Sequence, residues 1–325
     1  MSLGLSYVLP IRSRPGDGPA DELTEYLAWL GERVDLVIVD GSEPSSFLTH
    51  HDRWSAFATH VPPAEDVRCA NGKVRGVLTG LRTAREEGVV IADEDVRYDD
   101  AALEVMGRLL VEADLVRPQN YFDPLPWHAR WDTARILLNR AIGSDFPGTL
   151  GVRRSFLLSI GGYDGDVLFE NLELIRTVTA AGGRVVDAPS LFVRRRPPTF
   201  ARFLEQRPRQ AYDDWAQPLR FALFLATGPA IAAGIVRRPR GLGLAAGFAI
   251  LVARLGRARN GGREVFDRIS PLFAPLWIGE RAALAWVALI RRVVGAGCPY
   301  AGTVIIRAAN RPRVLRRRLR SRPSG

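Results

Sequence analysis

The stretch Gly88-Val89-Val90-Ile91-Ala92-Asp93-Glu94-Asp95 decides what fold we expect for this chain. Its apolar, β-branched half is typical of a buried strand, and three consecutive carboxylates follow it. Burying such a cluster unpaired is costly, so we expect the carboxylates to lie at an exposed strand end. In doubly wound folds, ligands bind at the carboxyl ends of parallel strands, where carboxylates can hold a divalent cation. The alternative interpretation is a solvated acidic turn.

Two further apolar runs, 5–9 and 34–39, precede this stretch, and helical patterns lie between the runs. Residues 21–30 carry leucines and aromatics at helical spacing behind an acidic first turn, and 74–87 show a second apolar helical face. This alternation predicts an α/β fold with a mostly parallel sheet flanked by helices. The later elements that we expect are a helix at 101–113, a strand at 114–118 that ends at its proline, mixed loop and helix at 119–140, and edge strands at 185–189 and 191–193.

The charge of the 325-residue chain is unevenly distributed. The formal net charge is +10, but residues 1–115 carry 11 basic and 21 acidic side chains, whereas residues 219–325 carry 20 and 3. This asymmetry predicts an anionic partner for the C-terminal third, either a membrane surface or a nucleic acid. The acidic first part argues against a nucleic-acid groove. Cys69 and Cys298 have no metal-binding spacing and favour a reducing environment, and the N-terminal residues indicate a strand rather than a signal peptide.

Apolar segments dominate the sequence beyond residue 215. The runs 221–236 and 241–253 are shorter than the roughly 20 residues that a straight membrane span needs. The run 271–290 is long enough, but it carries Glu280 and Arg281 in its middle. We therefore favour interfacial or re-entrant helices over clean spans.

These features predict two domains. Residues 1–215 would form a catalytic domain, and residues 216–325 an apolar and basic helical region associated with a membrane. The final segment, 307–322, holds eight arginines. It is interpreted either as a helix beside anionic lipid or as a disordered basic tail.

Polar residues follow three predicted strands and begin one predicted helix, so they would meet at one edge of the sheet. They are Pro10 and Arg12 after the first strand, Asp40 and Gly41 after the second, Asn71 and Lys73 at the helix start, and Asp93, Glu94 and Asp95 after the third strand. Asp40 would accept hydrogen bonds from a base or ribose, and Lys73, the only lysine, offers a point charge for phosphates. Asp93 and Asp95 would hold Mg²⁺ or Mn²⁺ bridging two phosphates.

The order Pro-x-Arg, Asp-Gly-Ser, Asn-Gly-Lys and Asp-x-Asp resembles the family 2 glycosyltransferases, which are inverting enzymes with the nucleotide-sugar-binding fold called GT-A. The similarity continues with 148–154, with the Gly-Gly-aromatic-Asp turn at 161–164, with 169–174, and with 206–210, which resembles the Gln-x-x-Arg-Trp motif of membrane members. The resemblance implies transfer of a sugar from a UDP-, GDP- or dTDP-linked donor to an acceptor hydroxyl. It also implies a membrane-associated bacterial enzyme of the cell envelope. The apolar and basic C-terminal region favours a lipid-linked or membrane-embedded acceptor, at the cytoplasmic face of the cell membrane.

The chain departs from this family at the position of the usual base, where it has Asn171. An amide cannot take up a proton, so we expect Glu170 to be the base, with Glu173 and Asp164 as alternatives; a structural carboxylate at the helix start is the other interpretation of Glu170. The resemblance assigns Gln206 to substrate binding, and either Lys73 or Arg209 would stabilise the leaving diphosphate. Gln210 replaces the motif's Trp, which argues against a processive polymerase.

The acceptor is weakly encoded. An aromatic group could form a sugar-stacking or lipid-facing wall, or could simply be packing; its members are Tyr121, Phe122, Trp127, His128 and Trp131. Two other functions stay open. A sugar nucleotidyltransferase would share the fold, but the residues after the first strand lack a Gly-rich phosphate loop. A non-catalytic GT-A-like protein that binds a membrane would explain Asn171.

Overall fold

The computed structural model describes residues 3–13, 21–300 and 302–321. The chain divides into two compact units. Unit 1 comprises Met1–Pro118, Pro147–Val193 and Asn310–Gly325, and unit 2 comprises Gln119–Phe146 and Arg194–Ala309. Residues 194–215 thus belong to the same compact unit as the C-terminal helices, and residues 310–325 belong to the unit that contains the N-terminal part. The functional boundary expected at residue 215 stays a prediction.

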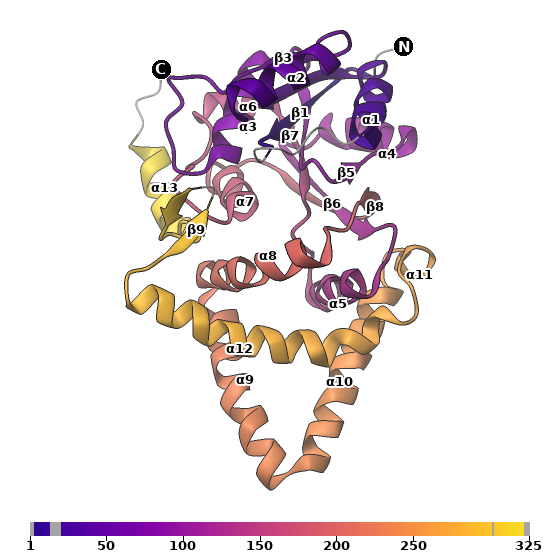
Figure 1. The fold of residues 1–325 in the computed structure, drawn as a ribbon, viewed down its shortest axis with the longest axis vertical. Helices are drawn as coiled ribbons and strands as arrows, with labels where there is room; N and C mark the ends of the chain where they lie inside the picture. Colours follow the sequence, from indigo (N-terminus) through magenta and orange to yellow (C-terminus); the bar gives the residue numbers. More distant parts are fainter. Residues whose placement is uncertain (1–2, 14–20, 301, 322–325) are drawn as a thin grey trace. The chain divides into compact units, whose positions relative to one another are not determined.

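An eight-stranded sheet lies mainly in unit 1, with strand order β3-β2-β1-β4-β7-β6-β8-β5 (Figure 1). The strands β1 (Leu5–Ile11), β2 (Asp35–Asp40), β3 (Thr59–Val61) and β4 (Gly88–Ala92) are parallel. The antiparallel strand β7 (Thr149–Arg153) pairs with β4 and with β6 (Leu115–Phe122). The remaining strands are β5 (Val96–Arg97) and β8 (Val185–Arg195). The predicted α/β fold with a mostly parallel sheet is confirmed.

The helices of unit 1 follow the predicted alternation. They are α1 (Asp21–Gly31), α2 (Pro44–Trp54), α3 (Gly72–Thr83), α4 (Asp100–Leu110), α6 (Arg154–Ser159), α7 (Glu170–Ala180) and α13 (Pro312–Arg320). Two strand predictions were wrong. β6 continues through Pro118, and β8 is one strand through Pro189. A proline removes only one ladder donor, and the pairing of β6 with β7 involves Leu115 and Val116, before the proline.

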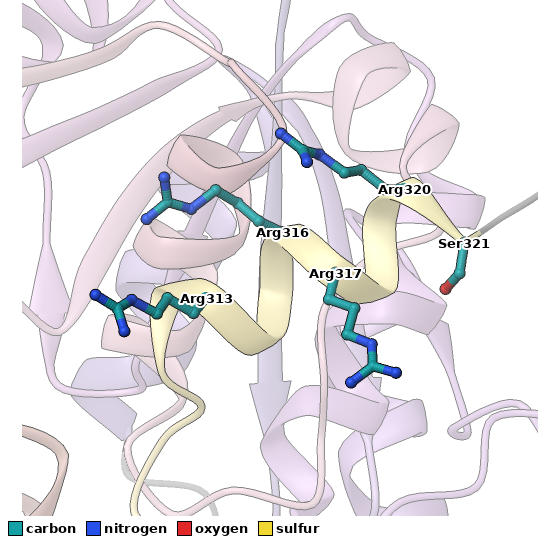
Figure 2. A pocket seen from close by; sticks show the side chains of 5 residues that line it. All are labelled: Arg313, Arg316, Arg317, Arg320 and Ser321. Atoms are coloured by element: carbon teal, nitrogen blue, oxygen red, sulfur yellow. The ribbon is translucent and has the colours of Figure 1, made fainter.

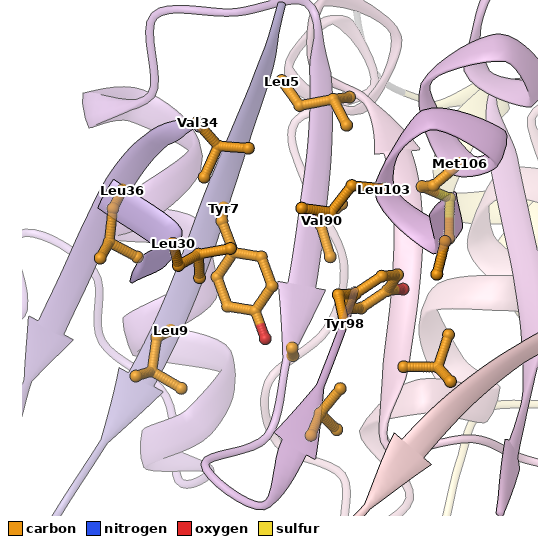
Figure 3. Packing of buried hydrophobic residues seen from close by; sticks show 14 of the residues in the cluster. Leu5, Tyr7, Leu9, Leu30, Val34, Leu36, Val90, Tyr98, Leu103 and Met106 are labelled. Atoms are coloured by element: carbon orange, nitrogen blue, oxygen red, sulfur yellow. The ribbon is translucent and has the colours of Figure 1, made fainter. Parts of the chain in front are cut away.

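The core of unit 1 lies between the sheet and its helices (Figure 3). Tyr7, Val90 and Leu103 are at most 1% exposed. The helix α3 lies very close to β1 because α3 has glycines where the two elements meet. A Cβ added at Gly80 would lie 2.3 Å from Cγ1 of Val8. This close approach fixes the position of the start of α3 relative to the strand ends.

Unit 2 is helical apart from short strand segments. Its elements are α5 (Trp127–Ile142), α8 (Phe200–Tyr212), η1 (Asp213–Ala216), α9 (Pro218–Arg237), α10 (Pro239–Ala258), α11 (Gly262–Val265), η2 (Ser270–Phe273), α12 (Ala274–Val293), β9 (Cys298–Tyr300) and β10 (Thr303–Ile305). Within this unit α9 and α10 form a hairpin, and α12 packs against both (Figure 1). The aromatic side chains of α5 pack with those of α8: the rings of Trp127 and Phe200 lie 4.9 Å apart.

The helices of the hairpin are longer than the apolar runs suggested. Both α9 and α10 have 20 residues, because the helices continue into flanking residues that interrupt the apolar pattern. By length and composition Pro218–Arg237, Pro239–Ala258 and Ser270–Val293 are each sufficient to cross a membrane. The prediction that the first two fall short in length was therefore wrong.

The charges within α12 are neutralised inside unit 2. The guanidinium of Arg207 on α8 donates to both oxygens of Glu280 at 2.6 Å, and to Asp132 at 3.0 Å. Arg281 donates to Asp214 at 3.4 Å. Burial would raise the pKa of Asp132, but its ion pairs with Arg135 and Arg207 outweigh this and hold that pKa well below its usual range. This network explains why an apolar helix carries Glu280 and Arg281.

Candidate functional site

The predicted strand-end residues of unit 1 lie at one edge of the sheet. Since β1, β2 and β4 are parallel, their carboxyl ends meet there, and Ile11 is the partner of Asp40 in the register. The start of α3 lies at the same edge, because Lys73 reaches the end of β4. The convergence of these segments is confirmed, whereas the roles of the individual residues stay predictions.

Lys73 joins two carboxylates that are far apart in the sequence. Its Nζ lies 2.5 Å from Oδ1 of Asp93 and 2.9 Å from Oε1 of Glu170. The side chains of Lys73, Asp93 and Glu170 are 15%, 25% and 8% exposed. Burial would lower the pKa of Lys73, but the two carboxylates outweigh it and raise that pKa well above its usual range. The Lys73 side chain therefore stays positively charged, and it lies between the carboxylates of Asp93 and Glu170.

The acidic turn after β4 has a defined backbone. The amide of Asp93 donates to the carbonyl of Gly148 at 2.9 Å, and the amide of Val96 donates to the carbonyl of Asp93 at 3.1 Å. Asp93 and Asp95 are half-buried, while Glu94 is exposed. Carboxylate oxygens on such a turn are the hard ligands that Mg²⁺ and Mn²⁺ prefer, so the donor set fits the expected cation.

Of the three carboxylates considered as the base, two are engaged by the C-terminal segment of unit 1. Oε2 of Glu173 accepts from the amide of Asn310 at 2.6 Å, and its Oε1 accepts from the Asn310 side chain at 2.7 Å. Asp164 accepts from the same Asn310 side chain at 2.8 Å and from Arg318 at 2.6 Å. Glu170, in contrast, contacts Lys73 at the sheet edge, and its role as the base stays a prediction.

The pKa directions of these two carboxyls are opposite. Burial raises the pKa of Glu173, and the hydrogen bonds from Asn310 do not fully compensate. Burial would also raise the pKa of Asp164, but hydrogen bonds from the backbone of Asp166, from Arg318 and from Asn310 lower it. Both groups are therefore part of the attachment of the C-terminal segment.

Asn171, at the position of the family's usual base, has a structural contact. Its side-chain amide donates to the carbonyl of Pro147 at 2.9 Å. This hydrogen bond ties the first turn of α7 to the segment that precedes β7. The amide can make this contact and an ionised carboxylate cannot, because a carboxylate has no proton to donate.

Asp40 lies in a histidine cluster that the sequence analysis missed. Its Oδ2 lies 2.5 Å from Nδ1 of His50 and 3.2 Å from Nε2 of His60, and its Oδ1 accepts from the amide of Ser42. Burial would raise the pKa of Asp40, but the hydrogen bonds from His60, Ser42 and His50 hold it well below its usual range. The three ligand atoms are also close enough together to hold a metal ion. The concentration of three of the four histidines within 50–60 was the signal that could have revealed it.

Asp40 is 1% exposed. Its two oxygens contact Ser42, His50 and His60, so Asp40 orients the end of β2. Through Ser42 it also supports β1, because the Ser42 hydroxyl accepts from the amide of Ser13 at 2.8 Å. Gly41 is only partly exposed.

The other predicted residues divide between the units. In unit 1 Arg12 is exposed at the end of β1, Pro10 packs against α3, and Asn71 is fully buried as the N-cap of α3. The Asn71 side chain also donates to the carbonyl of Val167 at 3.0 Å, a structural contact. Gln206 and Arg209 lie on α8 in unit 2, with the Arg209 guanidinium 4.5 Å from the ring centre of Tyr300 within that unit.

No protein-family model matches the chain, and a search of curated proteins finds no match either. Among solved structures the chain is similar to the mannosyltransferase PcManGT from Pyrobaculum calidifontis in complex with GDP-Man and Mn²⁺. The TM-score is 0.56 at 18% identity, over 89% of this chain and 86% of that one. The fold is that of a GT-A glycosyltransferase. The predicted GT-A fold is thus confirmed, and membership of family 2 stays a prediction.

Two further structures show weaker similarity. Mannosyl-3-phosphoglycerate synthase from Rubrobacter xylanophilus is 16% identical with a TM-score of 0.42, over 63% of this chain and 70% of that one. Glucosyl-3-phosphoglycerate synthase from M. tuberculosis is 20% identical with a TM-score of 0.41, over 61% and 74%.

Proposed function

We propose that this protein is an inverting glycosyltransferase that moves a sugar from a nucleoside-diphosphate donor to an acceptor hydroxyl with the help of Mg²⁺ or Mn²⁺. The observation that carries the proposal is the contact of Lys73 with both Asp93 and Glu170 at the carboxyl edge of a GT-A sheet. It brings together a cation, a turn rich in carboxylates and a candidate base. The fold alone would not support it, since one fold hosts many functions.

The proposed reaction is a single displacement at the anomeric carbon. The acceptor oxygen forms a bond to that carbon, the bond to the diphosphate oxygen breaks with its electron pair, and Glu170 takes the proton of the acceptor hydroxyl. Asp93 and Asp95 would hold the metal, which neutralises negative charge on the leaving diphosphate. Lys73 orients the Glu170 side chain through their contact and adds positive charge to the same edge.

The donor nucleotide would contact the edge formed by Ser13, Gly41 and Ser42, with Asp40 holding that edge in place. A GDP-sugar is the first donor to test, because the similar mannosyltransferase was solved with GDP-Man and Mn²⁺. UDP- and dTDP-sugars are the other candidates. The roles expected of Gln206 and Arg209, which lie on α8 of unit 2, stay predictions.

We further propose that the helices of unit 2 place the enzyme at the cytoplasmic face of a membrane, with a lipid-linked acceptor. A helix of 20 residues is about 30 Å long, which matches the hydrocarbon core of a bilayer. Leu219, Leu244 and Phe248 are 89%, 78% and 67% exposed in the hairpin. Such exposed apolar surface favours contact with lipid. We therefore propose a membrane-spanning hairpin in place of the interfacial helices that the sequence favoured.

A thermal-shift screen of the detergent-solubilised protein tests the donor site. GDP, UDP and dTDP are compared with and without Mn²⁺, and the screen is repeated with Asp95→Asn. We expect one nucleotide to raise the melting temperature only when Mn²⁺ and Asp95 are both present. A response that needs neither would place the nucleotide elsewhere and contradict the proposal.

A product assay separates the proposal from the two alternatives. Incubation with the donor that binds should release the nucleoside diphosphate, whereas release of pyrophosphate would indicate a nucleotidyltransferase. Asn171 favours the third possibility, a non-catalytic protein, because it occupies the position of the usual base and makes a structural contact. Nucleotide binding without turnover of any sugar donor or membrane acceptor would support that possibility.

A further inference from the structure

The C-terminal helix α13 is attached firmly to unit 1, so it is not a free basic tail. Leu315 is 4% exposed against the rest of the unit, and α13 packs on α7. Arg318 donates to Asp164 at 2.6 Å. Just before the helix, the carbonyl of Asn310 accepts from Arg176 at 2.9 Å, while its side chain holds Glu173 and Asp164. The helix therefore presents its remaining arginines in a defined arrangement.

Four of these arginines face solvent. They line an open hollow of about 490 Å³ together with Ser321; they are Arg313, Arg316, Arg317 and Arg320. Figure 2 shows Arg313, Arg316 and Arg320 extending from one side of the helix and Arg317 from the other. Within residues 3–13, 21–300 and 302–321, none of the four has an ion pair with a carboxylate. Four like charges on nine residues repel one another, so an anion at this surface would relieve an unfavourable interaction.

We propose that α13 binds the phosphate headgroups of an anionic lipid bilayer through these four arginines. A guanidinium donates two parallel hydrogen bonds to a phosphate, and a fixed arrangement loses less side-chain entropy than a tail. The proposal rests on the proposed membrane location of the protein and adds a second, electrostatic contact to it.

Two observations favour a bilayer over other polyanions. Residues 1–115, which form most of unit 1, carry a net charge of −10, which would repel an extended nucleic acid. Moreover, 18 residues separate α13 from α12, a helix long and apolar enough to enter a membrane. The same chain therefore offers an apolar segment for the bilayer core and a basic helix for its headgroups.

The test uses the full chain in lipid nanodiscs of two compositions. One is neutral phosphatidylcholine, and the other contains about 30% phosphatidylglycerol, which gives the bilayer a negative surface potential. Hydrogen exchange of the backbone amides of residues 313–320 is measured by mass spectrometry in both. We expect at least about fivefold slower exchange with phosphatidylglycerol, since each arginine near an anionic surface favours binding by about that factor. We also expect high salt to abolish the difference.

Two quadruple variants make the result specific. R313Q/R316Q/R317Q/R320Q should remove the lipid dependence of exchange. The matched control, R82Q/R85Q/R108Q/R184Q, removes four exposed arginines of unit 1 that form ion pairs. It should keep the lipid dependence of exchange. Equal exchange in both nanodiscs, or loss of the effect in the control, would overturn the proposal. Equal protection by millimolar inorganic phosphate over neutral lipid would assign the surface to a soluble anion and overturn the bilayer assignment.

The same samples report on the proposed function independently. The Mn²⁺-dependent nucleotide shift is recorded for each nanodisc preparation and each variant. Lipid-dependent protection of α13 without any nucleotide shift would contradict the glycosyltransferase proposal alone. A nucleotide shift without lipid-dependent protection would contradict the α13 proposal alone.

Discussion

The two units each contain a cluster of buried or half-buried charges, and the clusters differ in their balance. In unit 2, four arginines meet four carboxylates; they are Arg135, Arg207, Arg220 and Arg281 with Asp132, Asp145, Asp214 and Glu280. In unit 1, Lys73 is the cation between Asp93 and Glu170, and Glu94 and Asp95 stand beside Asp93.

This difference indicates what each cluster does. Within a balanced cluster every charge is compensated by the chain itself, so the cluster holds helices together without a ligand. The carboxylates after β4, in contrast, are oxygen ligands of the kind that a divalent cation prefers. The structural cluster therefore consists of pairs of opposite charge, whereas the candidate site gathers several carboxylates around one lysine.

The largest expected effect is on stability in unit 2. Arg207→Ala would leave Asp132 and Glu280 without their shared partner in a buried position, so the free energy of unfolding should fall by about 3–5 kcal/mol. Chemical denaturation in detergent measures it. Arg202→Ala, on the same helix with an exposed partner, is the control and should change stability by less than about 1 kcal/mol. Equal effects of the two variants would contradict the structural role.

The second prediction concerns activity in unit 1. Glu170→Gln keeps the shape of the side chain but cannot take up a proton, so the transfer rate should fall on the order of 10²–10⁴-fold. Nucleotide binding with Mn²⁺ should persist. Glu173→Gln, three residues further along α7, should retain most of the activity while lowering stability. If Glu173→Gln lost activity and Glu170→Gln did not, the assignment of the base would be reversed.

A smaller effect is expected from Asp40→Asn. The pKa of Asp40 is lower in the folded state than its ordinary value near 3.9, so the ionised group stabilises the fold above that pH, and this contribution is lost as the pH falls further. The variant should be less stable than the wild type by about 1–3 kcal/mol at pH 7. The difference should shrink below about pH 4. Thermal unfolding across pH 3–8 measures it, and a constant difference would count against the ionised form.

The smallest expected effect concerns the attachment of α13. Arg318 is 51% exposed in its pair with Asp164, so Arg318→Gln should lower the free energy of unfolding by no more than about 1 kcal/mol. The backbone amides of residues 313–320 should exchange faster in hydrogen-exchange experiments. Arg316→Gln, which removes the same charge without breaking a pair, is the control and should leave exchange unchanged in detergent.

Much of unit 1 was predictable because its signals are local. The apolar runs at β1, β2 and β4 predict buried strands, and the polar residues directly after each run predict where the strand ends. The histidines at 50 and 60 were missed because each contacts Asp40 only after α2 and β3 are in place. The lengths of α9 and α10 were underestimated because helices extend past the apolar pattern that marks them.

The sequence alone determined the α/β alternation and the concentration of carboxylates after the third predicted strand, since both follow from neighbouring residues. Tertiary structure decided which of those charges meet. Lys73 and Glu170 are 97 positions apart, and Arg207 and Glu280 are 73 apart. Their pairing depends on strand register and helix packing, which long-range contacts set and local composition does not encode.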